Sequence, residues 1–226
     1  MPRTLHSYTT GDWEDKFDAI NTKKRPFKTS ADDIDAAAVM TEFMFKNATT
    51  LYCRDDALKC SVVELPYAGR ELSFVVILPD AVDGLRELQR DVSVASLERM
   101  FGNVTAKSDV LLYLPKFKVE TTVELSEHLK ALGIVDLFSQ QKANLGGIEP
   151  KGALYVSAMA HKACIEVTEE GCEAAAVTAG LVRAAGGRTK AYTVFDADHP
   201  FLFLIKQNAT NMILFIGKYC GPSLRE

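Results

Sequence analysis

Residues 169–180 of the chain read EEGCEAAAVTAG and open a long stretch, residues 169–191, that is unlike the rest of the sequence. Small residues dominate its first half, and Arg183 and Arg188 flank a Gly186-Gly187 pair in its second half. A loop of this length without hydrophobic periodicity is uncommon in a compact domain, and such loops are usually functional or disordered. An alanine-rich surface helix that ends in glycine explains the same composition equally well.

Outward from this stretch, short apolar runs predict strands and period-3.6 patterns predict helices. The helices are expected at 83–89, 94–101 and 122–132, the last with Leu125, Leu129 and Leu132 on one face. Strands are expected at 39–45, 50–53, 60–65, 72–78, 110–113, 117–119, 154–159, 163–167, 192–195, 201–205 and 212–216. Strands and helices come in blocks instead of strict alternation, which predicts an α+β fold. No linker-like segment divides residues 1–226, so a single domain is expected.

Charge and hydropathy exclude several classes of protein. The 226 residues include 30 acidic and 26 basic side chains, and a net charge of −4 argues against a nucleic-acid partner. Lys206 and Gln207 interrupt the most apolar stretch, 201–216, so no membrane-spanning segment is expected. Met1 is followed by Pro2 and Arg3 without an apolar run, so no signal peptide is expected either.

The sequence gives little support for an enzyme or a metalloprotein. Five cysteines are an odd number, their spacing fits no zinc ribbon, and His161 with Cys164 lacks a second ligand pair. There is no G-x-S-x-G elbow and no glycine-rich phosphate loop after a strand. We therefore expect no catalytic residues, no cofactor and no metal, and we interpret His199 as structural.

Three Asn-x-Ser/Thr sequons, at Asn47, Asn103 and Asn208, are candidate glycosylation sites. Three in a chain of this size lean mildly towards secretion.

Two motifs that flank the long stretch resemble the serpins, a family of protease inhibitors. The run 169–179 is similar to the hinge of their reactive-centre loop, and FDADHPFLF at 195–203 is similar to the motif that follows it. Further agreement occurs at 11–17, 22–27, 65–67, 75–79, 114–117 and 211–217, so the resemblance covers residue 11 to the end. It implies a serpin-like α+β fold with antiparallel and mixed sheets, a few helices and an exposed loop at about 169–191.

The resemblance implies a suicide-substrate inhibitor of a serine or cysteine protease. After cleavage, the loop of such an inhibitor enters a sheet as an extra strand and carries the acyl-enzyme with it. The entering side chains must be small to pack. In an extended hinge, one face presents Cys172, Ala174, Ala176, Thr178 and Gly180, and Glu173 falls on the other. The hinge is therefore compatible with insertion. Cys172 stands where the family usually has threonine or serine, and an exposed thiol there could oxidise.

The family usually places the scissile residue sixteen positions beyond the first hinge glutamate. Counting from Glu169 nominates the bond Ala185–Gly186, which suits an elastase-like pocket. Arg183 or Arg188 would instead suit a trypsin-like pocket, with Arg188 the second choice. The expected partner is a serine protease of one of these two kinds, and Lys23-Lys24-Arg25 could contact a glycosaminoglycan.

The resemblance lacks a counterpart for the N-terminal part of the family. Residues 1–10, MPRTLHSYTT, are poor in β-branched apolar residues, so the central strand expected there is doubtful. A truncated chain that is a non-inhibitory binding module or a simple protease substrate is therefore the alternative to an inhibitor. The family and the sequons imply an extracellular protein, although no signal peptide is seen.

Overall fold

The computed structural model describes residues 3–8, 11–29, 39–104, 107–149, 154–172 and 192–222. The chain forms two compact units. The first comprises Met1–Thr9 and Lys118–Ile165, and the second comprises Thr10–Phe117 and Glu166–Glu226. The α+β arrangement expected from the sequence is present, with strands in three sheets and three α-helices among the described residues.

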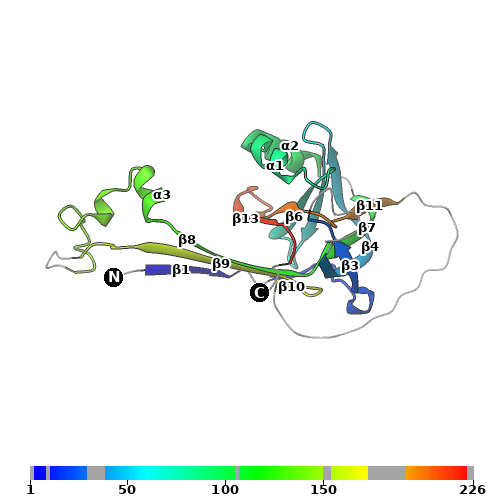
Figure 1. The fold of residues 1–226 in the computed structure, drawn as a ribbon, viewed down its shortest axis with the longest axis horizontal. Coiled ribbons are helices and arrows are strands. Elements are labelled where there is room, and N and C mark those ends of the chain that lie inside the picture. Colours follow the sequence, from blue (N-terminus) through cyan, green and yellow to red (C-terminus); the bar gives the residue numbers. More distant parts are fainter. Residues whose placement is uncertain are drawn as a thin grey trace. The chain divides into compact units, whose positions relative to one another are not determined.

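The first unit is built on a three-stranded sheet in the order β1-β9-β8 (Figure 1). Strand β1 (Arg3–Tyr8) runs parallel to β9 (Met159–Val167), in register from Arg3 opposite Met159 to Tyr8 opposite Cys164. The doubt about a strand within residues 1–10 was therefore wrong: backbone hydrogen bonds to β9 form a strand that side-chain propensity does not favour. The strand predicted at 154–159 was also wrong, because β9 begins at Met159.

The boundary between β8 (Phe117–Glu124) and α3 (Ser126–Ala131) differs from the prediction of a helix at 122–132. The β-branched residues Thr121, Thr122 and Val123 continue the strand. The Glu124 carboxylate then accepts a hydrogen bond from the Ser126 backbone amide at 3.0 Å, which satisfies one free donor at the start of α3. Leu132, just past the helix, is exposed, so the apolar face predicted for this helix is not fully buried. A short 3₁₀ turn follows at Asp136–Phe138.

The second unit contains an eight-stranded sheet in the order β11-β7-β4-β5-β6-β12-β13, with β3 also paired to β4. Its strands are β3 (Lys23–Phe27), β4 (Val39–Asp55), β5 (Cys60–Pro66), β6 (Leu72–Pro79), β7 (Lys107–Pro115), β11 (Thr193–Asp196), β12 (Phe201–Gln207) and β13 (Ile213–Tyr219). β4 is one continuous strand where the sequence predicted two. A two-stranded sheet of β2 (Gly11–Asp12) and β10 (Gly171–Cys172) and a 3₁₀ turn at Ala19–Asn21 complete the unit.

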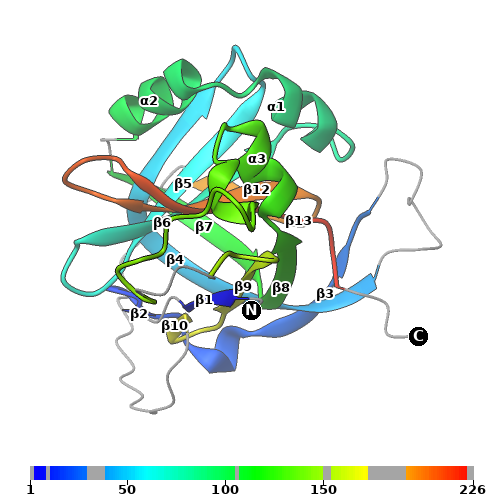
Figure 2. The same cartoon turned by 90° about the vertical axis from the view of Figure 1, so that its left-hand side faces the viewer.

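Helices α1 (Leu85–Asp91) and α2 (Val94–Asn103) follow each other along the chain and pack against strands of this sheet (Figure 2). Leu88, Met100 and Phe101 pack into a core with apolar residues of the strands, such as Val75 and Ile77. Burial of these faces explains why the two helices form where their periodicity predicts them.

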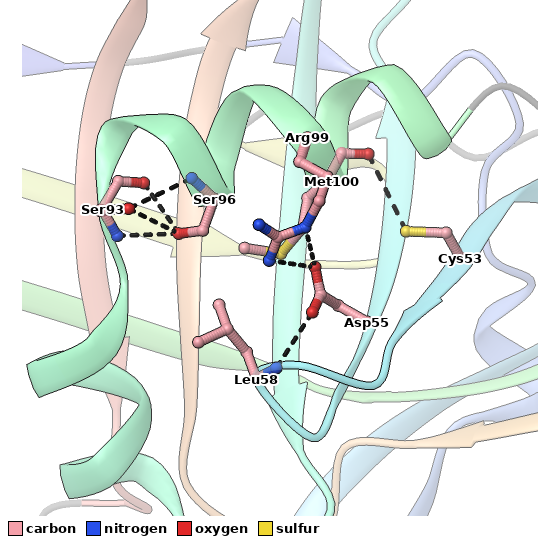
Figure 3. A network of polar contacts seen from close by, with 7 residues as sticks. All are labelled: Cys53, Asp55, Leu58, Ser93, Ser96, Arg99 and Met100. Carbon is pink, nitrogen blue, oxygen red and sulfur yellow. Dashed lines mark hydrogen bonds and ion pairs between the residues drawn. The ribbon is translucent and has the colours of Figure 1, made fainter.

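Polar contacts fix α2 to the β4–β5 hairpin (Figure 3). Ser93 and Ser96 form a capping box at the start of α2. One turn later, the Arg99 guanidinium donates to the buried Asp55 carboxylate at 2.8 and 3.0 Å, and the Leu58 amide donates to the other Asp55 oxygen at 3.0 Å. Burial alone would raise the pKa of Asp55, but these hydrogen bonds outweigh it and hold that pKa below its ordinary value.

Candidate functional site: the two ends of the long loop

The structure describes both ends of the loop that the sequence singled out. Glu169, Glu170, Gly171 and Cys172 lie within the described residues, and so does the segment from Tyr192 onward. The other predicted hinge and reactive-bond residues lie outside the described residues: Glu173, Ala174, Ala175, Ala176, Thr178, Arg183, Ala185, Gly186 and Arg188.

Backbone hydrogen bonds hold the N-terminal end of the loop. The Phe17 amide donates to the Glu169 carbonyl at 3.0 Å, and the Trp13 amide donates to the Glu170 carbonyl at 2.9 Å. The next two residues, Gly171 and Cys172, form β10 and pair antiparallel with Asp12 and Gly11 of β2. The segment that precedes the loop is thus attached to residues 11–17 over four consecutive positions.

The two hinge carboxylates add charged contacts to this attachment. Glu169 accepts a hydrogen bond from the Thr22 hydroxyl at 2.7 Å and lies 3.0 Å from the Lys116 ammonium group. Burial would raise the pKa of Glu169, but these partners outweigh it and hold that pKa below its ordinary value of 4.5. Glu170 accepts a hydrogen bond at 2.6 Å from Lys16, which also pairs with Asp12. The ionised Glu169 carboxylate therefore favours the attached form of the hinge, and the contact between Glu170 and Lys16 adds to the attachment.

Trp13 is the centre of the attachment, and sequence reasoning assigned it no role. Its ring is 2% exposed and stacks on Tyr67, with centroids 4.9 Å apart. Phe74 and Phe17 approach it edge-on at 5.7 and 6.3 Å. The indole nitrogen donates to the Thr168 carbonyl at 2.8 Å. A lone tryptophan in an otherwise polar segment was the sequence signal that could have identified it, since a buried tryptophan needs a partner for its N–H.

Gly171 is required by the geometry of this attachment. Its φ is +144°, and a Cβ added there would overlap the Gly11 carbonyl oxygen. We expect Gly171→Ala to destabilise the attached hinge by about 1–3 kcal/mol from the backbone conformation alone. Limited proteolysis at neutral pH, with a protease of broad specificity, should show faster cleavage next to residue 171. Ala substitution of Gly102, which has open space around its Cβ position, is the matched control. Equal cleavage rates for the two variants would contradict this assignment.

The Glu169 attachment should depend on pH. Because the pKa of Glu169 is lowered by its partners, its contribution to stability is complete above pH 4.5 and is lost as the pH falls below that value. Urea unfolding at pH 7 and at pH 3 should therefore show a larger loss of stability for the unmodified chain than for Glu169→Gln, which lacks the ionisable group. Parallel losses in the two proteins would show that the contact contributes nothing.

Ion pairs hold the C-terminal end of the loop as well. Strand β11 pairs parallel with β7, which places Asp196 opposite Tyr113. The Asp196 carboxylate accepts two hydrogen bonds from Arg25, at 2.6 and 3.1 Å. The guanidinium of Arg25 lies over the Tyr113 ring, 4.2 Å from its centroid. A bidentate pair backed by an aromatic face fixes the position where the loop rejoins the sheet.

The next residues continue this attachment and confirm the structural role of His199. Lys28 pairs with Asp198 at 2.7 Å. His199 is buried; its Nδ1 hydrogen-bonds to Asp198 at 2.8 Å and its Nε2 to the Pro79 carbonyl at 2.7 Å. Its ring therefore ties the FDADHPF segment to the end of β6.

The remaining predicted features are dispersed. Asn47 and Asn103 are exposed, whereas the Asn208 amide nitrogen donates to the Arg70 carbonyl at 2.9 Å. Strand alternation in β3 puts Lys24 on the face opposite Lys23 and Arg25.

Among the described residues, no group of three or more His, Cys, Asp or Glu is placed to hold a metal ion. None of the helices in this part of the chain has the length and apolar character that a membrane span requires.

Comparisons of the sequence with family models and with curated proteins agree on one family. The family model described as serpin (serine protease inhibitor) matches residues 6–222. The leukocyte elastase inhibitor of Xenopus laevis is 38% identical over 219 residues, which are 95% of this chain and 56% of that protein. A serine protease inhibitor of Cyanea capillata is 39% identical over 218 residues, which are 96% of this chain and 55% of that protein. The chain thus spans about half the length of these curated relatives.

Solved structures agree with this result. Serpin48 of the insect Tenebrio molitor superposes with a TM-score of 0.79 at 32% identity, covering 98% of this chain and 56% of that one. The serpin-like fold expected from the sequence is therefore confirmed, and the two attached ends of the loop occur in a chain that matches the family model over nearly its whole length. This chain belongs to the serpin family.

Proposed function

We propose that the chain carries the bait and hinge of a serine protease inhibitor that traps its target by insertion of the cleaved loop. The observation that carries the proposal is the attachment of both loop ends. Glu169 and Glu170 hold one end through Thr22, Lys116 and Lys16, and Asp196 holds the other through Arg25. A loop fixed at both ends is displayed to a protease in a restricted form, and cleavage frees one end to move.

Insertion would require the sheet of the first unit to open beside β9. The loop follows β9 along the chain, so a cleaved loop that turned back would lie antiparallel to β9. One side of β9 is already paired with β8, and the other side is paired with β1 over six residues. The entering strand would therefore have to take the place of β1 beside β9. The small residues Ala174, Ala176 and Thr178 suit this step because they can enter a packed sheet.

The target we propose is an elastase-like serine protease. The small residues around Ala185–Gly186 suit a narrow specificity pocket, and five of the relatives bear the name leukocyte elastase inhibitor or leukocyte elastase inhibitor A. Arg183 and Arg188 keep a trypsin-like target as the second candidate. Secretion, glycosylation and a glycosaminoglycan partner remain predictions from the sequence, and so does the assignment of residues 1–226 to one domain.

The experiment that tests the proposal is incubation of the chain with pancreatic elastase and, separately, with trypsin. We expect a covalent complex that survives boiling in SDS and has the summed mass of the protease and the N-terminal cleavage product. Mass spectrometry of the released C-terminal peptide reads the scissile bond, expected after Ala185. Cleavage without a complex would favour the alternative of a simple substrate, and resistance to both proteases would favour a binding module.

A further inference from the structure

A pocket of about 290 Å³ lies on one face of the eight-stranded sheet, next to the C-terminal end of the loop. Its lining consists of Asn21, Lys23, Arg25, Phe43, Phe45 and Tyr113. Three neighbouring strands build it, since register places Lys23 of β3 opposite Phe43 of β4, and Phe45 opposite Tyr113 of β7. Its volume is at the lower limit for drug-sized ligands, about 300 Å³, and fits one side chain better.

The walls of the pocket are aromatic and rigid. The Phe45 and Tyr113 rings contact each other with centroids 4.6 Å apart, and Phe43 is 1% exposed. Arg25 lies between the rings of Phe43 and Tyr113, at 5.1 and 4.2 Å from their centroids. Because Asp196 fixes the guanidinium through two hydrogen bonds, the pocket keeps its form without a ligand.

The charge of the pocket selects an acidic occupant. Asp196 compensates the charge of Arg25, whereas Lys23 is exposed and makes no ion pair with a residue that the structure describes. The positive charge of Lys23 therefore remains uncompensated next to the aromatic residues Phe43, Phe45 and Tyr113. A carboxylate flanked by apolar carbon atoms complements both features, because the carboxylate meets the ammonium group and the carbon atoms meet the rings.

The position of the pocket identifies which partner would supply that carboxylate. Asp196 and Tyr113 are opposite each other on adjacent strands, and Val194, two residues earlier in β11, is 60% exposed on the same face. Strands are spaced about 4.8 Å apart, so Phe45 of β4 lies only about 10 Å from β11. A protein bound to the loop is several times wider than this distance and is therefore large enough to reach the pocket.

We propose that this pocket is a second contact site for the target protease, which would place there an acidic side chain flanked by apolar surface. The inference rests on the proposed function, because it takes the occupant to be the protein that engages the loop. Contacts outside the scissile bond act mainly on encounter and orientation, so the pocket would speed association with the protease without changing the outcome after cleavage.

The test measures association of the chain with pancreatic elastase and trypsin whose active-site serine is replaced by alanine, so that trapping plays no part. Lys23→Gln is compared with Lys24→Gln, a matched control that removes the same charge from the opposite face of the same strand. We expect Lys23→Gln to slow association with the engaged protease by about three- to tenfold at low ionic strength. Lys24→Gln should stay within twofold. The difference should shrink as salt is added.

Phe45→Ala tests the aromatic wall and should weaken binding to the same protease, with its melting temperature recorded to exclude misfolding. Equal rates for the two lysine variants with both proteases would overturn the contact site. A glycosaminoglycan is the competing occupant: if heparin binds and both lysine variants weaken it alike, the strand edge is a polyanion surface, which also overturns the proposal.

The two experiments distinguish failure of the inhibitor proposal from failure of the contact-site proposal. Lys23-dependent binding without a covalent complex between the chain and active protease would leave the contact site standing and exclude trapping. A covalent complex with equal association rates for both lysine variants would support trapping and exclude the contact site. Absence of both binding and cleavage would overturn the two proposals together.

Discussion

Trp13→Ala is expected to lower the free energy of unfolding by about 3–5 kcal/mol, as for other buried aromatic residues cut back to alanine. The ring is almost fully buried between Tyr67, Phe74 and Phe17, and its removal leaves a cavity in the second unit. It also leaves the Thr168 carbonyl without its indole donor. Urea unfolding followed by circular dichroism measures the loss.

Two further variants separate the packing of Trp13 from its hydrogen bond. Trp13→Phe keeps an aromatic ring against Tyr67 but cannot donate to Thr168, so its loss of stability should be the smaller one. Val94→Ala removes a side chain that is 73% exposed and should stay within about 0.5 kcal/mol of the unmodified chain. A loss below 1 kcal/mol for Trp13→Ala would contradict its placement at the centre of the hinge attachment.

Ala176→Arg is expected to abolish trapping and to turn the chain into a substrate. In an extended hinge, Ala176 falls on the face that also carries Ala174 and Thr178 and that would pack into the sheet. A guanidinium on that face would have to be buried without a partner, which costs several kcal/mol. The measurement is the fraction of chain found in covalent complex, relative to the fraction merely cleaved, after incubation with active elastase.

Ala175→Arg is the matched control for that variant. Ala175 falls on the opposite face, together with Glu173, where a charge is already present in the sequence. We expect this variant to keep most of the trapping that the unmodified chain shows. If Ala175→Arg and Ala176→Arg lose trapping equally, the hinge does not enter a sheet in the alternating form that the proposal requires.

Sequence patterns predicted the fold best where side-chain burial decides the local structure. The helix pattern of Leu88 and Phe101 and the apolar runs of β5, β6 and β12 are satisfied by one continuous core. Sequence patterns predicted the wrong local structure where backbone hydrogen bonding, and not side-chain burial, decides which element forms. β1 forms because β9 offers it hydrogen bonds, and the start of α3 moves to Ser126 because β-branched residues extend β8.

The candidate site was predictable only in part for the same reason. The motifs located both ends of the loop, since they occupy short contiguous segments. The partners of those ends are distant in the sequence: Thr22 and Lys116 meet Glu169, and Arg25 meets Asp196. Long-range pairing of this kind has no local signature. The basic run 23–25 was predicted from the sequence as a candidate glycosaminoglycan contact, and the structure adds that strand alternation divides it between two faces and that Arg25 pairs with Asp196.

The melting temperature of the chain before and after cleavage within residues 183–188 tests the central claim most directly. If the cleaved loop enters the sheet beside β9, it adds a complete strand of backbone hydrogen bonds, and the cleaved chain should melt well above the intact one. The Ala176→Arg variant, cleaved in the same way, should show no such gain. A melting temperature that stays the same or falls after cleavage of the unmodified chain would contradict insertion, and with it the trapping mechanism.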